Sequence, residues 1–172
     1  MTIIQDSREK RHYHDNVVDG LTALGHKVVR SKLYVGDYTL PANQSVCIDL
    51  KQDLQEVYSN IIAQHDRFIR ECKRAQDAGI RLIILTEQGG IRSLQDVAKW
   101  RNPRIARWFK IRDGQIRGAY RGIKLPKQPP VSSDRLAKAM QTIAERYCVE
   151  WMFCAKSETV KVICELLEIE VK

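Results

Sequence analysis

The sequence lacks several features that mark particular classes of protein. No apolar stretch approaches the roughly 18 residues needed to cross a bilayer, so no membrane partner is expected. The N-terminus MTIIQDSREK has no basic region followed by an apolar one, so no signal peptide is visible. The 5 cysteines form no C-x-x-C pair and lie in apolar patterns, which predicts reduced core residues. Together these absences favour a cytoplasmic protein without disulfides.

Acidic residues are nearly missing from one segment. Residues 101–130 contain nine Lys and Arg but a single acid, Asp113, and this segment accounts for the net charge of +8. Such a footprint is typical of binding to a polyanion such as DNA, although charge runs also occur on solvated loops. Interleaved aromatic residues would suit stacking on unpaired bases. The residues expected to contact DNA here are Arg101, Arg104, Arg107, Lys110, Arg112, Arg117 and Arg121.

Apolar periodicity predicts a single α/β domain over residues 1–172, with a mixed central β-sheet flanked by helices on both faces. We expect strands at residues 2–6, 26–35, 37–40, 45–51, 81–87 and 150–155. We expect helices at residues 15–25, 53–78, 93–100, 133–147 and 157–169, with Ser133 capping the fourth. Residues 91–131 form a basic insertion between core units, with a hairpin at 109–120 around Asp113-Gly114. The last helix is apolar on two sides, so it is either fully buried or packs on a second copy in a homodimer.

One predicted strand carries charged residues that need an explanation. Asp49 and Lys51 alternate with Val46, Ile48 and Leu50, and so project from the same face of a strand that is otherwise apolar enough for a sheet interior. Unpaired burial of either charge would cost several kcal/mol. They therefore either form a structural ion pair or meet a divalent cation.

Asp37 strengthens the cation hypothesis because it begins the preceding hairpin strand and can reach Asp49 across the sheet. Mg²⁺ usually takes one or two carboxylates and keeps several waters, which leaves room for a phosphate. Two Asp and a Lys are then suited to phosphodiester hydrolysis, in which the metal activates water and the ammonium stabilises developing charge.

Four ordered motifs surround this constellation. They are IIQDSREK, LYVGDYTL, CIDLKQDLQEV and HDRFIREC. Together they resemble the V-D-x-R-E, G-D-Y, V-E-R-K-x-x-x-D and D-x-R-F motifs of XPF-type structure-specific endonucleases, a branch of the PD-(D/E)xK nuclease superfamily. The resemblance covers nearly the whole chain except residues 91–131. It implies a restriction-endonuclease-like fold and a metal-dependent DNA endonuclease that acts on branched, flapped or forked DNA in repair, recombination or replication.

The resemblance also implies roles for individual residues. The implied ligands of Mg²⁺, for which Mn²⁺ would substitute, are Asp37, Asp49 and the backbone carbonyl of Leu50. Lys51 would be the catalytic lysine. Asp6 and Glu9 would complete an acidic rim. The residues implied to contact phosphate or brace those acids are Arg8 and Arg67.

The chain departs from the family pattern at several positions. Asp49 replaces a Glu, Leu50 replaces an Arg, and Gln55 stands where the family has a trailing Asp, with Asp53 as a possible substitute. Larger relatives also carry helix-hairpin-helix modules that this sequence does not show, so we expect residues 101–130 to supply part of the DNA grip. A catalytically weak DNA-binding module, acting as the accessory subunit of a nuclease complex, is the alternative function.

Overall fold

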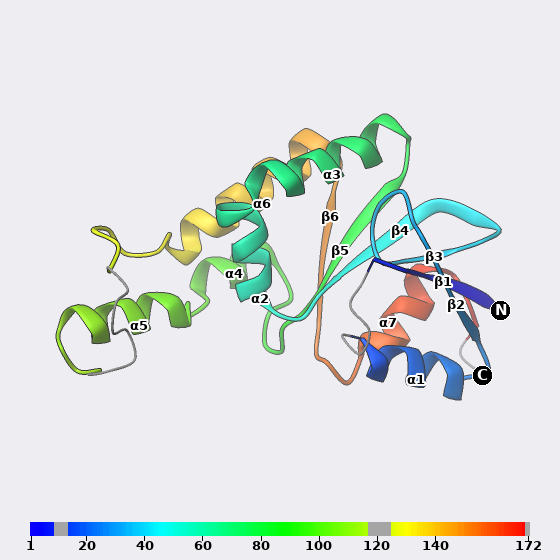
Figure 1. Cartoon of the computed structure of the whole chain (residues 1–172), viewed down its shortest axis with the longest axis horizontal. Coiled ribbons are helices and arrows are strands. Elements are labelled where there is room, and N and C mark those ends of the chain that lie inside the picture. The colour runs from blue at the N-terminus through cyan, green and yellow to red at the C-terminus, as the bar shows by residue number, and fades with distance from the viewer. Residues whose placement is uncertain (9–13, 117–124, 171–172) are drawn as a thin grey trace.

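The computed structural model describes residues 1–8, 14–116 and 125–170, which form a six-stranded mixed sheet with the order β2-β1-β3-β4-β5-β6 (Figure 1). Strands β1 and β2 are parallel, as are β4, β5 and β6, whereas β3 runs antiparallel to both β1 and β4. The strands are β1 (Thr2–Asp6), β2 (Lys27–Ser31), β3 (Tyr38–Leu40), β4 (Asn43–Lys51), β5 (Arg81–Glu87) and β6 (Glu150–Cys154). The expected mixed sheet is therefore confirmed.

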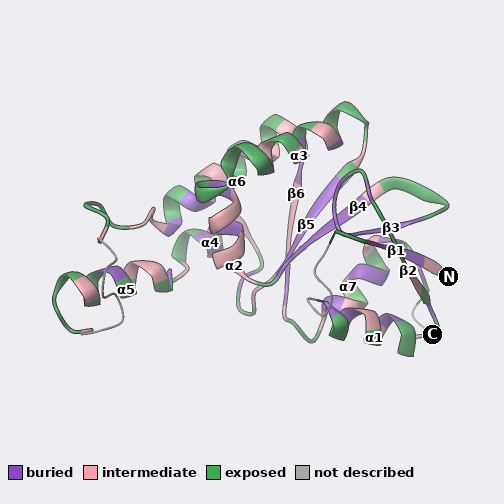
Figure 2. Cartoon of the chain, in the orientation of Figure 1, coloured by how far each residue is buried: buried purple, intermediate pink, exposed green. Residues whose placement is uncertain are grey.

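Helices cover both faces of the sheet and create two hydrophobic clusters. On one face lie α1 (Asp15–Ala23) and α7 (Thr159–Leu166). The other face is covered by α2 (Leu54–Tyr58), the π-helical turn η1 (Ser59–Ala63), α3 (His65–Asp77), α4 (Leu94–Lys99) and α6 (Ser133–Tyr147). Figure 2 shows that buried residues run along the central strands between these layers. Among the residues that the structure describes, no helix is long and apolar enough to cross a membrane.

The period-2 pattern of β4 assigns its side chains to opposite faces. Cys47 belongs to the cluster under α3 and α6, whereas Ile48 and Leu50 belong to the cluster under α1 and α7. Asp49 and Lys51 share the parity of Cys47, so they face the layer that contains α2, η1 and α3. This parity decides which helix can complete a site around the two charges.

The long helix expected at residues 53–78 is interrupted. Asp53 caps α2 by accepting a hydrogen bond from the backbone N–H of Glu56 at 2.8 Å. The turn then widens in η1, where the N–H of Gln64 bonds to the carbonyl of Ser59 at 2.9 Å, and α3 begins at His65. The chain leaves helical geometry at Gln64, where φ is −118° and ψ is 28°. The sequence did not indicate this break, because residues 53–78 contain no Gly or Pro.

The hairpin expected around Asp113-Gly114 is wrong for the residues that the structure describes. Instead, α5 (Pro103–Arg112) extends away from the sheet (Figure 1). Asn102 caps this helix by accepting from the N–H of Arg104 at 3.0 Å, and Gly114 ends it with a φ of 70°. A Gly with positive φ serves a helix end as well as a hairpin turn, so the Asp-Gly pair alone was ambiguous.

Smaller boundaries also differ from expectation. The second strand ends at Ser31 rather than continuing to residue 35, and the N-cap of α6 is Ser132 rather than Ser133. The short helix expected after Ser93 is confirmed as α4, with the Ser93 hydroxyl accepting from the N–H of Asp96 at 3.3 Å.

The two apolar sides of α7 are both used within the chain. Ile163 and Cys164 are fully buried, and Val162 and Leu166 pack half-buried against the same cluster. The large hydrophobic residues that are exposed in the described part of the chain do not include any from α7. The pattern that suggested a partner is thus also explained by packing between the sheet and α1.

A surface ion pair joins β5 and β6. Arg81 donates from Nε and Nη2 to the two carboxylate oxygens of Glu150 at 2.7 and 2.8 Å, and these bonds lower the pKa of Glu150 below its usual value. A lowered native pKa means that the stabilisation is present above the unfolded pKa and is lost as the pH falls through the native value. We expect Glu150→Gln to lower the free energy of unfolding by less than about 1 kcal/mol at neutral pH, because both side chains are exposed. Urea unfolding should show this difference shrinking at acidic pH, and a difference that did not change with pH would contradict the assignment.

Candidate active site

A polar cavity of about 260 Å³ lies where β3 and β4 meet α3. It collects side chains that are distant in the sequence but were expected to act together. The predicted site residues that line it are Asp6, Arg8, Asp37, Asp49, Lys51 and Arg67. Glu9, which was expected to join them, lies outside the residues that the structure describes.

Asp37 is fixed by hydrogen bonds to both neighbouring strands. Its backbone N–H donates to the carbonyl of Ile48 at 2.7 Å, and its own carbonyl accepts from the N–H of Asp6 at 2.8 Å. Its carboxylate oxygen Oδ2 accepts from the N–H of Leu50 at 2.8 Å. The carboxylate is therefore held at the end of β4, beside Asp49.

Asp49 and Lys51 form the ion pair that the sequence left as one of two explanations. Lys51 Nζ lies 2.8 Å from Asp49 Oδ1, and both residues are buried, with 3% of Asp49 and 9% of Lys51 exposed. The pair does not satisfy the whole carboxylate, because Asp49 Oδ2 is buried and has no hydrogen-bond partner. A buried carboxylate oxygen without a partner is costly, so its place beside a second carboxylate favours a bound cation.

The electrostatics of the cavity keep Lys51 charged. Burial alone would lower the pKa of Lys51, but the carboxylates of Asp49, Asp37 and Glu56 together raise it above its ordinary value. Lys51 therefore stays an ammonium at neutral pH, which suits it to stabilising negative charge rather than to accepting a proton.

Two further acids were missed by the sequence analysis. Glu56 Oε1 lies 3.8 Å from Lys51 Nζ, and Glu71 lines the cavity while accepting from the N–H of Gly36 at 3.1 Å. Burial raises the pKa of Glu71, and the charge of Asp49 raises it further. Glu71 follows Phe68 by three residues on α3, so its position on the buried face was the signal that could have identified it.

The donors present fit a divalent cation with few protein ligands. Asp37 and Asp49 offer two carboxylates from adjacent strands, and Mg²⁺ commonly takes one or two carboxylates and completes its shell with water or phosphate. Within the described residues, no three His, Cys, Asp or Glu side chains gather into a ligand set. The carbonyl of Leu50 stays a predicted third ligand.

Asp6 and Arg8 brace the rim of the cavity. Arg8 Nε donates to Asp6 Oδ2 at 2.7 Å, and Arg8 Nη2 donates to the carbonyl of Leu33 at 2.8 Å. Asp6 Oδ1 also accepts from the N–H of Arg8 at 3.1 Å. The side-chain hydrogen bond to Asp6 and the charge of Asp6 raise the pKa of Arg8. The two bonds from Arg8 to Asp6 occupy both oxygens of that carboxylate. Of the roles expected for Arg8, bracing an acid is the one that this geometry favours.

The family's trailing acid has no direct counterpart. Gln55 lines a different cavity, and Asp53 is engaged in capping α2. Glu56 comes next in the sequence after Gln55 and is the acid of α2 that approaches Lys51. Arg67 is exposed but lines the active cavity, where it bonds to Gln64 Oε1 at 3.4 Å.

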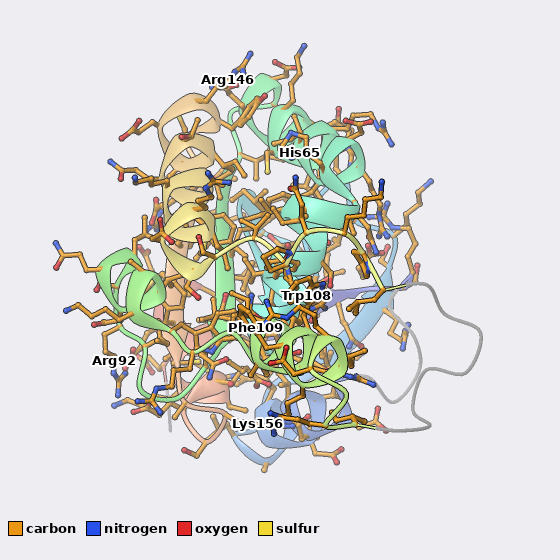
Figure 3. All side chains as sticks on the ribbon, turned by 90° about the vertical axis from the view of Figure 1, so that its left-hand side faces the viewer. His65, Arg92, Trp108, Phe109, Arg146 and Lys156 are labelled. Carbon is orange, nitrogen blue, oxygen red and sulfur yellow. The ribbon has the colours of Figure 1, made fainter. Side chains whose placement is uncertain are left out.

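The expected DNA-contact residues of the insertion divide into two groups. Arg104 is half-buried: its Nη2 donates to the carbonyl of Gln55 at 3.2 Å and to Ser59 Oγ at 2.7 Å, and its guanidinium lies 5.0 Å from the centroid of the Tyr58 ring. The second group is exposed on or beside α5, which Figure 3 views from its own end of the molecule. This group consists of Arg101, Arg107, Lys110 and Arg112. Arg117 and Arg121 lie outside the described residues.

Arg104 should therefore contribute to stability as well as to charge. We expect Arg104→Ala to lower the free energy of unfolding by about 1–3 kcal/mol, because two hydrogen bonds and a ring contact that join α5 to α2 and η1 are lost. Arg101→Ala removes the same charge from an exposed position and should change stability by less than about 0.5 kcal/mol. Urea unfolding of both variants checks this difference, and equal effects would contradict the structural role.

The site belongs to an α/β domain whose sheet delivers two buried aspartates and a lysine to one polar cavity. This is the arrangement that the resemblance to XPF-type nuclease domains implies. The chain belongs to the ERCC4 domain family, a family of nucleases, and the match covers residues 5–166.

Solved structures share this fold. XPF from Aeropyrum pernix is 18% identical with a TM-score of 0.61, and the alignment covers 98% of this chain and 64% of that one. A second structure, XPF from Aeropyrum pernix in complex with DNA, is 18% identical with a TM-score of 0.59, covering 97% and 63%. The chain thus spans less than two thirds of the length of these structures. Comparison with curated proteins finds no match.

Proposed function

We propose that this protein is a Mg²⁺-dependent DNA endonuclease that hydrolyses phosphodiester bonds in branched, flapped or forked DNA. The observation that carries the proposal is the buried, unpartnered oxygen of Asp49 next to Asp37 and Lys51 in a polar cavity. Membership of a nuclease family supports the reaction class, and the likeness to an XPF structure solved with DNA supports the substrate.

In this mechanism Asp37 and Asp49 would hold the cation, with the carbonyl of Leu50. When bound, Mg²⁺ supplies Lewis acidity and lowers the pKa of a bound water. The Lys51 ammonium stabilises the charge that develops on the phosphate. Arg67, at the cavity wall, would neutralise a neighbouring phosphate, while Asp6 and Arg8 keep the β1 end in place.

A cleavage assay tests the proposal directly. Flap, fork, Holliday-junction, duplex and single-stranded DNA are incubated with the protein in Mg²⁺ or Mn²⁺, alongside Asp37→Asn and Lys51→Ala. We expect cleavage of at least one branched DNA by the wild type and a loss of about 100-fold or more in each variant. Strong DNA binding without cleavage would contradict the proposal and support the accessory function instead.

Self-association through α7 is a separate part of the proposal. The half-buried Val162 and Leu166 leave an apolar margin that a second copy could cover. Sedimentation equilibrium of the wild type and of Leu166→Glu tests this part of the proposal. A wild type that is monomeric at all concentrations would contradict the homodimer.

A further inference from the structure

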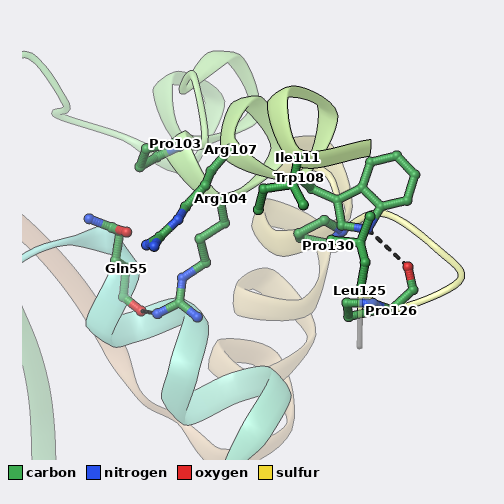
Figure 4. Close-up of a pocket in the computed structure, with 9 residues that line it drawn as sticks. All are labelled: Gln55, Pro103, Arg104, Arg107, Trp108, Ile111, Leu125, Pro126 and Pro130. Atoms are coloured by element: carbon green, nitrogen blue, oxygen red, sulfur yellow. Dashed lines mark hydrogen bonds between the residues drawn. The ribbon is translucent and has the colours of Figure 1, made fainter. Parts of the chain in front are cut away.

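A second cavity, of about 540 Å³, lies between α2, α5 and the proline-rich segment before α6, residues 125–130 (Figure 4). Its walls come from segments far apart in the sequence, and its volume falls within the range of about 300–1,000 Å³ that is typical of small-ligand sites. It differs from the active cavity in that none of its described lining residues is acidic. The proposed mechanism does not use it.

The spacing of residues on α5 gives this cavity two chemically different ends. Arg104, Arg107, Trp108 and Ile111 lie at helical spacing on one face. Figure 4 shows Arg104 and Arg107 pointing toward α2, while Trp108 points toward the proline-rich segment. One end is therefore cationic, and the other is apolar.

The apolar end is built rather than incidental. Trp108 is buried, and its Nε1 donates to the carbonyl of Pro126 at 3.1 Å, which fixes the proline-rich segment against α5. Ile111 and Leu125 complete this end, and both are only half-buried. An apolar surface with these neighbours can accept a flat ring.

Helix α2 and the η1 turn that follows it connect the two cavities, because Gln55 of α2 lines the second cavity and Asn60 of η1 lines the active cavity. Gln55 lines the second cavity, and the next residue, Glu56, lies 3.8 Å from Lys51. Helix α2 has 5 residues, which corresponds to a length of about 8 Å. A DNA strand whose phosphate occupies the active cavity would thus pass the second cavity within a few nucleotides.

We propose that this cavity holds one unpaired nucleotide of the DNA strand being cut, with its phosphate against Arg107 and its base at the apolar end. The inference rests on the proposed function and specifies its substrate class as DNA with a single-stranded arm. Charge favours this occupant, because residues 101–112 contain five basic residues and no acid. A paired base cannot reach such a site, since its faces are stacked within the duplex.

Binding measurements in EDTA test the inference without requiring cleavage. Fluorescence anisotropy compares a blunt duplex with the same duplex carrying a single-stranded arm, for the wild type and two charge-matched variants. Arg107→Gln should weaken binding to the armed DNA roughly fivefold to tenfold more than binding to the blunt duplex. Lys110→Gln removes the same charge from the same helix outside the cavity, and should weaken both DNAs alike by about twofold to threefold.

A fluorescent base locates the occupant. With 2-aminopurine placed at successive positions of the arm, one position should change its emission on binding to the wild type. That change should be lost in Ile111→Ser, which shortens a half-buried side chain of the apolar end. The inference would be overturned if Arg107→Gln and Lys110→Gln weakened binding to both DNAs equally, or if the emission were the same at every position. Neither result would contradict the proposed nuclease function. Failure to bind any of the DNAs would overturn the proposed function itself.

Discussion

Asp49→Asn should reduce cleavage by about 100-fold or more, because it removes one of two proposed carboxylate ligands and weakens the site for a cation. It should also lower the free energy of unfolding by about 3–5 kcal/mol, since it leaves the buried Lys51 ammonium without its closest partner. Cleavage of branched DNA in Mg²⁺ and urea unfolding in EDTA measure the two effects separately. Full activity in this variant would remove Asp49 from the site.

A double variant separates the two consequences. Asp49→Asn with Lys51→Met removes both members of the buried ion pair, and replacing both members of such a pair often restores stability. We expect the double variant to unfold close to the wild type but to remain inactive. A thermal-shift measurement adds a readout that does not depend on catalysis, since Mn²⁺ should raise the melting temperature of the wild type only. Recovery of activity together with stability would mean that the single variant had merely failed to fold.

Gly36→Ala should be the most damaging of the small substitutions near the site. Gly36 has a φ of 70°, and a Cβ there would lie 3.0 Å from the carbonyl oxygen of Ile48 and 3.2 Å from its carbonyl carbon. The left-handed conformation costs about 1–2 kcal/mol for Ala, and the contact adds about 1–3 kcal/mol because backbone atoms must move. The same carbonyl holds the N–H of Asp37, so we expect cleavage to fall as well.

Gly25→Ala is the matched control for this prediction. Gly25 also has a positive φ, 79°, but a Cβ there would meet nothing within 4 Å. The free energy of unfolding of Gly25→Ala should therefore fall only by the conformational cost, about 1 kcal/mol, and the variant should keep its cleavage activity. Urea midpoints and cleavage rates of the two variants isolate the close approach of Gly36 to β4. Similar losses in both variants would show that the packing around Gly36 contributes little.

The sequence predicted the structure best where charged residues alternate with apolar ones along a strand. The alternation from Val46 to Lys51 predicted a strand with both charges on one face, and β4 confirms it. The strand expected at residues 81–87 is likewise confirmed as β5, and its continuous apolar run is buried on both faces. Such patterns are readable because burial on a known face restricts the residue types at each position.

What the sequence could not show depends on helix phase and on distant contacts. Glu71 lies three residues after Phe68 and could be assigned to the buried face of α3, but no Gly or Pro marks the break at Gln64, after which α3 lies against the cavity. Arg104 looked like any other charge of the basic segment, yet it bonds to Ser59, which is distant in the sequence. The charge total predicted a basic segment, but the roles of its individual residues depend on which side chains point inward.

The widened turn at Ser59–Ala63 lies between the helix that lines the second cavity and the helix that lines the active cavity. A π turn contains about one more residue than an α-helical turn, and the helix ends directly after it at Gln64, where φ is −118° and ψ is 28°. Before the turn, Gln55 of α2 lines the second cavity, and after the turn, Glu71 of α3 lines the active cavity. Losing a single residue here would shift the start of α3, and Glu71 would no longer lie where it accepts from the N–H of Gly36. The spacing of a whole reaction centre can thus be set by the count of residues in one turn.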